Sequence, residues 1–169
     1  MALHNDFADQ NCSVARTLEV IGERWSLLIL RDAFLGVRRF DQFQSRLGIS
    51  RNVLTARLQH LVEQGVLRRE QYSERPPRSE YCLTSRGRDL YPVIMAMVDF
   101  GDRHAPTPAG PPRIFTHKGC GGLLDKRHLR CEKCGEDVPL RELAQEKGPG
   151  FDGPIGTFGP VEERAPASG

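Results

Sequence analysis

The sequence has no long hydrophobic run, few aromatic residues and almost no net charge. Its longest purely apolar stretches are a few residues, as at 27–30, whereas a membrane-spanning helix needs about 20. Aromatic residues make up 7% of the 169 residues, and 24 basic residues nearly balance 22 acidic ones. We therefore expect no membrane partner, and no binding function that depends on overall basicity. The length suits one domain, or one domain with a small satellite.

Cysteines are also few, and common enzyme signatures are missing. The five cysteines are an odd number, and three of them lie late in the chain, which argues against a secreted disulfide framework. Residues 1–11 are polar and lack the basic and apolar regions of a secretory signal. The chain has no P-loop, G-x-S-x-G or H-E-x-x-H motif. These absences predict a cytoplasmic protein that is not an enzyme.

An amphipathic helix is predicted over residues 50–64, SRNVLTARLQHLVEQ. Apolar residues recur at i, i+4, i+7 and i+8 and form one stripe: Leu54, Leu58, Leu61 and Val62. Ser50 is the expected N-cap. The opposite face carries mostly short or amide-bearing side chains, which can reach base edges. They are Asn52, Thr55, Ala56, Gln59 and Glu63.

A second short amphipathic run precedes this helix. Residues 39–47 carry a stripe of Phe40, Phe43 and Leu47, and a short connection with Gly48 follows. Two short helices joined by a tight turn are typical of a helix-turn-helix, whose second helix lies in the DNA major groove. Two ordinary core helices are the alternative interpretation of the same spacing.

A β-hairpin is predicted directly after these helices. Alternation at 66–72 and 80–84 favours two short strands, and SERPPR at 73–78 is typical of a loop between them. A hairpin in this position is the wing of a winged helix, whose Arg75 and Arg78 can reach phosphate or the minor groove. A plain surface loop is the alternative for SERPPR.

Positive charge is concentrated around these elements. Eleven arginines and five acidic residues lie between residues 38 and 88, an excess of six positive charges. A DNA-binding surface needs such an excess because it must neutralise phosphates. A solvated charged face is the alternative.

Two helices are predicted before the helix-turn-helix. Ser13 caps the first, whose expected buried positions are Val14, Ala15, Leu18 and Ile21. Residues 23–35 are apolar enough to be the central packing helix, which Gly36 ends. Trp25, the only tryptophan, is expected to anchor the core.

A further helix is predicted after the hairpin, from Thr84 or Ser85 to about His104. Pro92 fits this helix only in a first turn or at a kink. Its apolar positions are too many for a solvent-facing tail, and we expect them to bury against the core or a second subunit. They are Leu90, Val93, Ile94, Met97, Val98 and Phe100.

Composition divides the chain into four parts. Four prolines within residues 104–113 mark a semi-rigid linker, and the glycine- and proline-rich stretch from 148 onward is expected to be poorly ordered. The predicted parts are a winged-helix DNA-binding and dimerisation domain at 1–104, a proline-rich linker at 105–113, a zinc-ribbon-like subdomain at 114–147 and a tail at 148–169.

Four residues after the linker have the spacing of metal ligands. His117 and Cys120 form H-x2-C, and after ten further residues Cys131 and Cys134 form C-x2-C. Two such turns supply the four donors of a closed tetrahedral zinc site, which is structural rather than catalytic. The pattern predicts a small zinc ribbon. A metal-free, turn-rich subdomain or a disulfide between two of the three thiols is the alternative.

Three segments resemble the HxlR-type winged-helix transcriptional regulators, which are relatives of the MarR regulators. They are GERWSLLIL at 22–30, RRFDQFQSRLGISRNVLTARLQHLVEQGVL at 38–67 and RPPRSEYCLTSRG at 75–87, with Cys12 ahead of the first helix. The resemblance covers roughly residues 12–104. It implies a mainly α fold with a small β-hairpin wing. It also implies a homodimer, formed through the N- and C-terminal helices, that binds a roughly palindromic operator in double-stranded DNA, in most members as a repressor.

The resemblance assigns roles to residues of this chain. The base-reading candidates are Ser50, Arg51, Asn52, Thr55 and Gln59. Phosphate contacts, which add affinity without sequence information, are assigned to Arg38, Arg39, Arg75 and Arg78. Arg57 fits a DNA contact or a structural ion pair equally well. The rival hypothesis is a zinc-dependent protein-interaction module whose winged helix serves assembly only, and the arginine excess argues against it.

Cys12 is a candidate redox sensor. It lies directly before a predicted helix N-terminus, where the helix dipole and free amide groups make a thiol more reactive. Several members of the resembled family sense oxidants or electrophiles through a cysteine at this place. The resemblance therefore implies a small-molecule or oxidant effector. An inert, partly buried thiol is the alternative.

Overall fold

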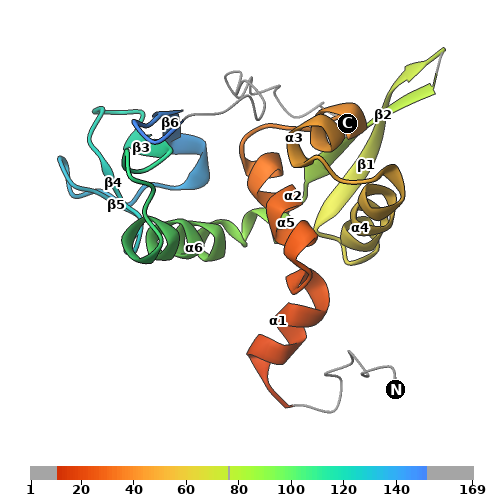
Figure 1. The fold of residues 1–169 in the computed structure, drawn as a ribbon, viewed down its shortest axis with the longest axis horizontal. Coiled ribbons are helices and arrows are strands. Elements are labelled where there is room, and N and C mark those ends of the chain that lie inside the picture. The colour runs from red at the N-terminus through yellow and green to blue at the C-terminus, as the bar shows by residue number, and fades with distance from the viewer. Residues whose placement is uncertain (1–10, 76, 152–169) are drawn as a thin grey trace. The chain divides into compact units, whose positions relative to one another are not determined.

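The computed structural model describes residues 11–75 and 77–151. These residues separate into two compact units, 11–87 and 88–151. No helix within the described ranges is long and apolar enough to cross a membrane. The elements, shown in Figure 1, are α1 (Ser13–Ile21), α2 (Arg24–Phe34), α3 (Phe40–Leu47), α4 (Arg51–Glu63), β1 (Leu67–Glu74), β2 (Pro77–Leu83), α5 (Ser85–Arg88), α6 (Tyr91–His104), β3 (Arg113–His117), β4 (Leu124–Asp125), β5 (Arg130–Cys131), η1 (Leu140–Glu142) and β6 (Leu143–Lys147).

The core of the first unit lies between α2, α3, α4 and the start of β1. The predicted stripe of α4 is confirmed by full burial of its three leucines, and Val62 is half-buried. Gly65 has a φ of 66°, a left-handed conformation that ends α4 and turns the chain into β1. The fully buried apolar side chains of this unit are Ile29, Leu30, Phe43, Leu54, Leu58, Leu61, Val66 and Leu67.

The hairpin β1–β2 is longer than predicted. Its antiparallel register runs from Leu67 opposite Leu83 to Glu74 opposite Pro77, with an irregularity between Gln71 and Ser73. Most of SERPPR is therefore strand rather than loop. Pro77 is compatible with this pairing because it is the first residue of its strand. The hairpin projects beyond the helices of its unit (Figure 1). Pro76, at the predicted wing tip, lies outside the described residues.

The helix α1 and Trp25 are less buried than predicted. Ala15 and Ile21 are buried, but Val14 is 67% and Leu18 45% exposed, so the prediction that these two belong to the core is wrong. The reason is that α1 contacts α4 at its last turn, whereas its first part extends away from α2–α4 (Figure 1). Trp25 is half-buried in the first turn of α2, with the Arg24 guanidinium 5.7 Å from its ring centre.

The single helix predicted after the hairpin is in fact two helices. α5 ends at Arg88, and α6 begins at Tyr91 with Pro92 in its first turn. The break has a steric cause, since a proline inside a helix lacks an N–H and clashes with the preceding turn. The apolar positions of α6 divide in two: Tyr91, Ile94 and Met95 are buried, whereas Val93, Met97 and Phe100 are exposed.

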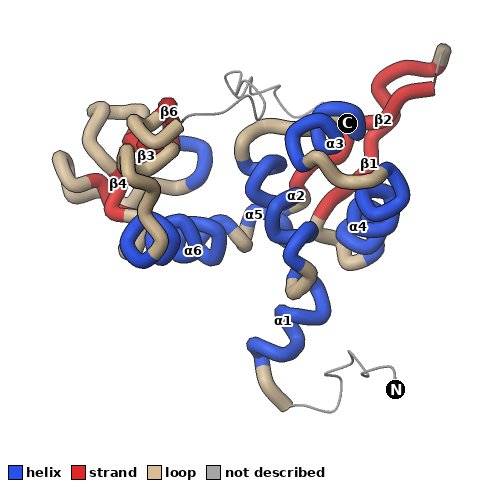
Figure 2. The backbone as a smooth tube through the Cα atoms, in the orientation of Figure 1, coloured by secondary structure: helices blue, strands red, loops and turns tan. Residues whose placement is uncertain are grey.

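The second unit combines α6 with short strands and long connections (Figure 2). β3 pairs antiparallel with β6, from Arg113 opposite Lys147 to His117 opposite Leu143, and β4 pairs with β5. Its buried apolar residues come from both parts: Tyr91, Ile94, Met95, Phe115, Leu124, Cys131 and Val138. The Tyr91 hydroxyl donates to the carbonyl of Val138 at 3.2 Å, and burial raises the pKa of Tyr91 to about 12.

The first residues of the predicted tail are part of this unit. The amide of Gly148 donates to the carbonyl of Pro112 at 3.0 Å, and that of Gly150 to Pro111 at 3.2 Å. Residues 148–151 thus bind the end of the predicted linker. The remainder of the predicted tail, 152–169, lies outside the described residues.

A buried ion pair joins α2 to α3 in the first unit. The Arg46 guanidinium donates to both carboxylate oxygens of Asp32, at 3.1 and 3.2 Å. The Asp32 side chain is fully buried and that of Arg46 is 5% exposed. Such pairs depend on both partners, because a buried charge left alone is strongly unfavourable.

We expect Arg46→Ala to lower the free energy of unfolding by about 3–5 kcal/mol, because Asp32 would stay buried without its main partner. Urea unfolding of the full chain, followed by circular dichroism, measures this loss. The control is Arg31→Ala, which removes the more exposed arginine from the same carboxylate and should cost below about 1 kcal/mol. Equal losses in the two variants would contradict the assignment.

Candidate DNA interface and metal centre

The turn between α3 and α4 has the geometry of a helix-turn-helix. Gly48 ends α3 in a left-handed conformation, with a φ of 63°. Ser50 then caps α4, because its Oγ accepts a hydrogen bond from the amide of Val53 at 3.3 Å. The predicted N-cap is confirmed. This turn leaves one side of α4 facing the core and the other facing solvent.

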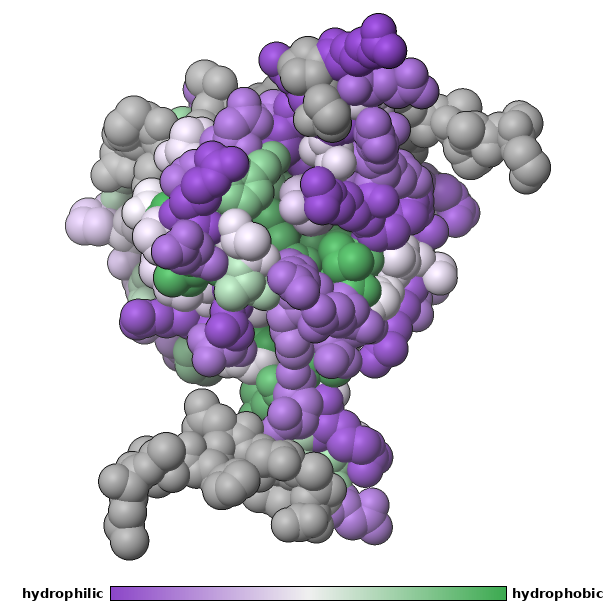
Figure 3. Space-filling view, turned by 90° about the vertical axis from the view of Figure 1, so that its right-hand side faces the viewer, coloured by the Kyte–Doolittle hydropathy of each residue, from purple (hydrophilic) through white to green (hydrophobic). Residues whose placement is uncertain are grey.

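The solvent side of α4 carries the five base-reading candidates, and all of them are exposed. We call this set the α4 polar face, and its members are Ser50, Arg51, Asn52, Thr55 and Gln59. Some already have local partners. The Arg51 guanidinium lies 4.9 Å from the Phe40 ring centre, and Gln59 Nε2 donates to Glu63 Oε1 at 2.9 Å. Hydrophilic residues cover much of the side of the first unit shown in Figure 3.

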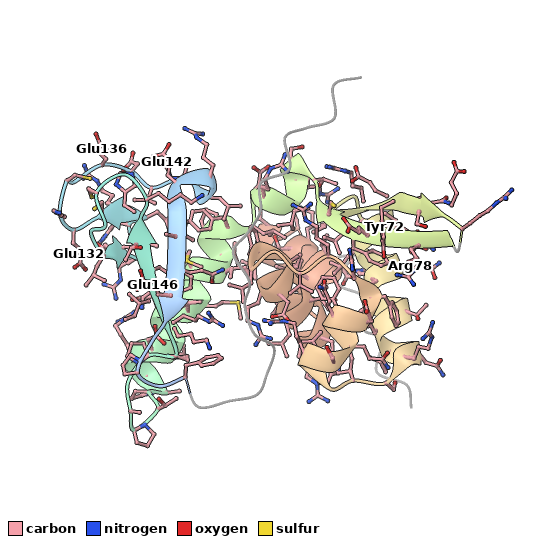
Figure 4. All side chains as sticks on the ribbon, turned by 90° about the horizontal axis from the view of Figure 1, so that it is seen from above. Tyr72, Arg78, Glu132, Glu136, Glu142 and Glu146 are labelled. Carbon is pink, nitrogen blue, oxygen red and sulfur yellow. The ribbon has the colours of Figure 1, made fainter. Side chains whose placement is uncertain are left out.

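The hairpin presents basic and aromatic side chains. Arg75 and Arg78 are exposed at its outer end, and Tyr72 is 39% exposed. Figure 4 shows Tyr72 and Arg78 on the hairpin of the first unit. Arginines at the end of a projecting hairpin are suited to phosphate or groove contacts.

Arg38 and Arg39 lie at the base of the hairpin. The carbonyl of Arg38 accepts from the amide of Tyr81 at 2.8 Å. Arg39 pairs with Glu80 at 3.6 Å and lies 5.0 Å from the Tyr72 ring centre. Arg39 therefore links the start of α3 to the wing, and part of its charge is compensated within the protein.

Other arginines of the basic stretch have structural partners. Arg46 is buried against Asp32, and Arg57 Nη1 lies 4.0 Å from Glu23 Oε1. The sequence left a DNA contact and a structural ion pair open for Arg57, and the structure shows the ion pair. Part of the excess of six positive charges is therefore neutralised by acidic side chains of the same protein.

The four predicted metal ligands come together in the second unit. Their ligand atoms all lie within 4.8 Å of one another. His117 Nδ1 is 3.3 Å from Cys134 Sγ and 3.6 Å from Cys120 Sγ, and Cys120 Sγ is 3.3 Å from Cys131 Sγ. Three thiols and one imidazole at this spacing fit one metal ion, and four protein donors leave no open position for substrate.

Backbone hydrogen bonds favour the thiolate form of one cysteine in the cluster. Gly121 and Gly135 follow the two ligand turns with φ values of 69° and 74°, conformations that favour glycine. The amide of Cys134 donates to the Cys131 sulfur and, with other donors, lowers the pKa of Cys131 to about 6. Cys131 is therefore the member of the cluster most readily present as thiolate, the form that binds metal.

Glu142 contacts the histidine of the cluster. Leu143 pairs with His117 in the β3–β6 ladder, which brings the neighbouring Glu142 Oε2 to 3.3 Å from His117 Nε2. Because a carboxylate accepts, Nε2 donates to Glu142, and Nδ1 is the ring nitrogen that faces the sulfurs. A carboxylate behind a ligating histidine is a common feature of metal sites. Figure 4 shows Glu142 near the start of β6 and Glu146 farther along that strand.

The remaining cysteines lie outside this cluster. Cys12 is the exposed N-cap residue of α1, and Ser13 is the first residue inside the helix, so the prediction that Ser13 caps this helix is wrong. Cys82 is half-buried within β2, and burial raises the pKa of its thiol.

Comparison with known proteins establishes the family. Residues 20–108 match the model of the HxlR-like helix-turn-helix family, and the chain belongs to that family. It is a helix-turn-helix transcriptional regulator, and the related proteins are likewise regulators rather than enzymes. The fold class expected from the sequence, a winged helix with a small additional subdomain, agrees with this assignment.

Individual relatives extend the likeness. The HTH-type transcriptional regulator Rv3095 of Mycobacterium tuberculosis is 50% identical over 139 residues, which cover 82% of this chain and 87% of the relative. The crystal structure of PA1607, a candidate transcription factor, has a TM-score of 0.65 at 37% identity, covering 78% of this chain and 89% of that one. The redox regulator HypR in its oxidized form has a TM-score of 0.52 at 35% identity, covering 55% of this chain and 97% of HypR.

Two residues of these sites were missed in the sequence. Glu142 lies 25 positions from His117, and no spacing rule connects a carboxylate that distant to a ligand. His60 lies at the edge of the polar side of α4, yet it binds α1. Only the pairing of β3 with β6 and the packing of α1 on α4 reveal these contacts.

We expect Glu142→Ala to weaken binding of Co²⁺ by about 10–100-fold, because His117 loses the partner that fixes its ring. Competition with a chromophoric chelator, using the purified full chain, measures this affinity. Glu146→Ala changes an exposed glutamate of the same strand pair and should leave the affinity unchanged. An unaltered affinity in Glu142→Ala would rule out the orienting role.

Proposed function

We propose that this regulator binds a roughly palindromic operator in double-stranded DNA as a homodimer and acts mainly as a repressor. The observation that carries the proposal is the α4 polar face, which is exposed along a helix whose opposite side is locked into the core. In a winged helix this helix enters the major groove. Asn52 and Gln59 suit adenine, Arg51 suits guanine, and Thr55 suits a thymine methyl.

The hairpin supports this proposal as a second contact. Arg75 and Arg78 extend the basic surface beyond the helices, where they would meet phosphate. Arg38 and Arg39 would add contacts nearer the base of the wing. The rival function is protein interaction through the second unit alone. That function would not require these exposed arginines.

Exposed apolar side chains support a homodimer. Val14 and Leu18 are one turn apart on α1, and Val93, Met97 and Phe100 follow one another at helical spacing on α6. Each set is a stripe that a monomer would leave in water, and Phe100 is 63% exposed. Contiguous exposed apolar residues mark protein–protein contacts. A second copy is the occupant expected of a regulator that reads two half-sites.

We further propose that the His117, Cys120, Cys131 and Cys134 cluster binds zinc and has a structural role. Three thiolates and an imidazole are the donors that suit zinc, and the ion would hold together strands too short to be stable alone. Within the second unit, Lys126 pairs with Asp102 at 2.6 Å and Arg127 with Asp99 at 3.8 Å. The metal would keep the ribbon folded, and these ion pairs would connect the folded ribbon to α6, a helix of the proposed dimer surface.

An oxidant or small molecule is proposed as the effector. Cys12 is exposed at the start of α1, and a structural neighbour, HypR, is described as a redox regulator. A change at Cys12 would act on a helix of the proposed dimer surface.

We expect the double variant Arg75→Ala/Arg78→Ala to bind random duplex DNA with a shallower salt dependence. Each phosphate contact contributes about 0.9 to the slope of log K against log salt, so a loss of about 1–2 is expected. Fluorescence anisotropy of a labelled duplex at several salt concentrations measures the slope.

The control for this measurement is Arg141→Ala, which removes an exposed arginine of the second unit and should leave the slope unchanged. An unchanged slope in the double variant would remove the wing from the interface. Failure of the folded, metal-loaded wild-type chain to bind DNA at low salt would favour the protein-interaction function instead.

We expect Phe100→Glu to convert the dimer to monomer, because it places a charge in the proposed apolar contact. Sedimentation velocity over a range of protein concentrations reports the association. Leu123→Glu makes the same change at another exposed apolar residue of the second unit, 51% exposed, and should remain dimeric. A dimer that persists in Phe100→Glu would exclude α6 from the contact.

A further inference from the structure

His60 connects α4 to α1 through hydrogen bonds. Its Nε2 lies 3.2 Å from the carbonyl oxygen of Glu19 and 3.1 Å from that of Val20. Carbonyl oxygens only accept, so Nε2 carries the proton and donates to them. One imidazole N–H of α4 is therefore shared between two carbonyls of the last turn of α1.

The place of this donor, at the end of a helix, is physically favourable. The final carbonyls of an α-helix have no intrahelical N–H to accept from, and the amide of Gly22 bonds only the carbonyl of Leu18. A donor supplied by a neighbouring helix satisfies the next carbonyls and fixes the end of α1 at the same time.

Arg57 adds a second contact from the same side of α4. It lies three residues before His60, and its Nη1 is 4.0 Å from Oε1 of Glu23, the N-cap residue of α2. Between the two contacts, Gly22 makes the α1–α2 turn so tightly that a Cβ would run into the carbonyl of Leu18. His60 therefore contacts the residues just before this turn, and Arg57 contacts the residue just after it.

The rest of α1 contributes little to its attachment. Only Ala15 and Ile21 are buried, while Val14 and Leu18 face solvent. The position of α1 relative to α4 thus depends strongly on the junction.

We infer that His60, supported by Arg57, is a positioning residue that couples α1 to the DNA-reading helix. The inference rests on the proposed role of α4 in reading DNA. Core packing gives α4 its main orientation, and His60 adds a contact through which a shift of α1, on effector binding or dimer rearrangement, alters the fit of the α4 polar face to bases. Phosphate contacts, which tolerate small rotations, are affected less.

The test compares the wild type, His60→Ala and His60→Gln on two duplexes of equal length. One is selected from a random pool with the wild-type protein, and the other is a random sequence. His60→Ala should bind the selected duplex about three- to tenfold more weakly, the cost of one hydrogen bond, and the random duplex with little change. His60→Gln, whose amide N–H can donate, should recover most of the loss.

Hydrogen–deuterium exchange provides a readout that needs no DNA. In the free protein, His60→Ala should speed amide exchange across α1 and leave the leucine-anchored α4 protected, whereas His60→Gln should not. On addition of the selected duplex, exchange in α1 should slow in the wild type and His60→Gln but not in His60→Ala. A merely structural role would speed exchange throughout the first unit.

Two further variants keep the inference open to disproof. Arg57→Gln leaves His60 in place and should show the same pattern more weakly, even if His60→Ala does not fold. His128→Ala removes an exposed histidine of the second unit and should change neither measurement. Equal losses on both duplexes, or normal exchange in α1 of His60→Ala, would overturn the coupling. A wild type that binds the two duplexes equally would instead refute the proposed reading function, whatever the exchange in α1 shows.

Discussion

The first unit depends on burial of one side of α4. Leu54, Leu58 and Leu61 are fully buried, and each contributes about 1.5–3 kcal/mol on leaving water. Because side chains on a helix have fixed angular positions, burying this stripe also fixes the direction of the α4 polar face. The caps on either side, Ser50 and Gly65, then set where the helix begins and ends. The same packing that stabilises the fold therefore orients the surface proposed to read DNA.

The second unit is held together in a different way. Its strands have two to five residues, and its apolar core is small, so side chains that bind one another or a metal have to contribute more. The His/Cys cluster brings four residues of the ribbon together. The ion pairs of Asp99 and Asp102 attach the loop that carries Lys126 and Arg127 to α6. Buried Tyr91 adds a hydrogen bond from the same helix. In this unit, the candidate metal cluster and the position of α6 would be parts of one network.

Local patterns predicted the elements of the fold well, and long-range packing less well. The stripe of α4, the Ser50 cap and the clustering of His117 with three cysteines were predicted because helical period, capping and ligand spacing are local properties. Val14, Leu18 and Trp25 were assigned to the core because they are apolar, but their exposure depends on where α1 and the start of α2 meet the other helices. Glu142 and His60 were missed for the same reason, since each acts on a residue at least 25 positions away.

The arginines illustrate why charge counted in a sequence overstates charge available to a ligand. Arg46 neutralises a buried aspartate, Arg39 pairs with Glu80, and Arg57 contacts Glu23. These three hold α2, α3, α4 and the wing in their mutual positions. Exposed arginines such as Arg75 and Arg78 remain on the outer part of the hairpin. Internal pairs position the α4 polar face and external ones would supply affinity, so loss of an internal pair should disturb recognition of sequence more than attraction to phosphate.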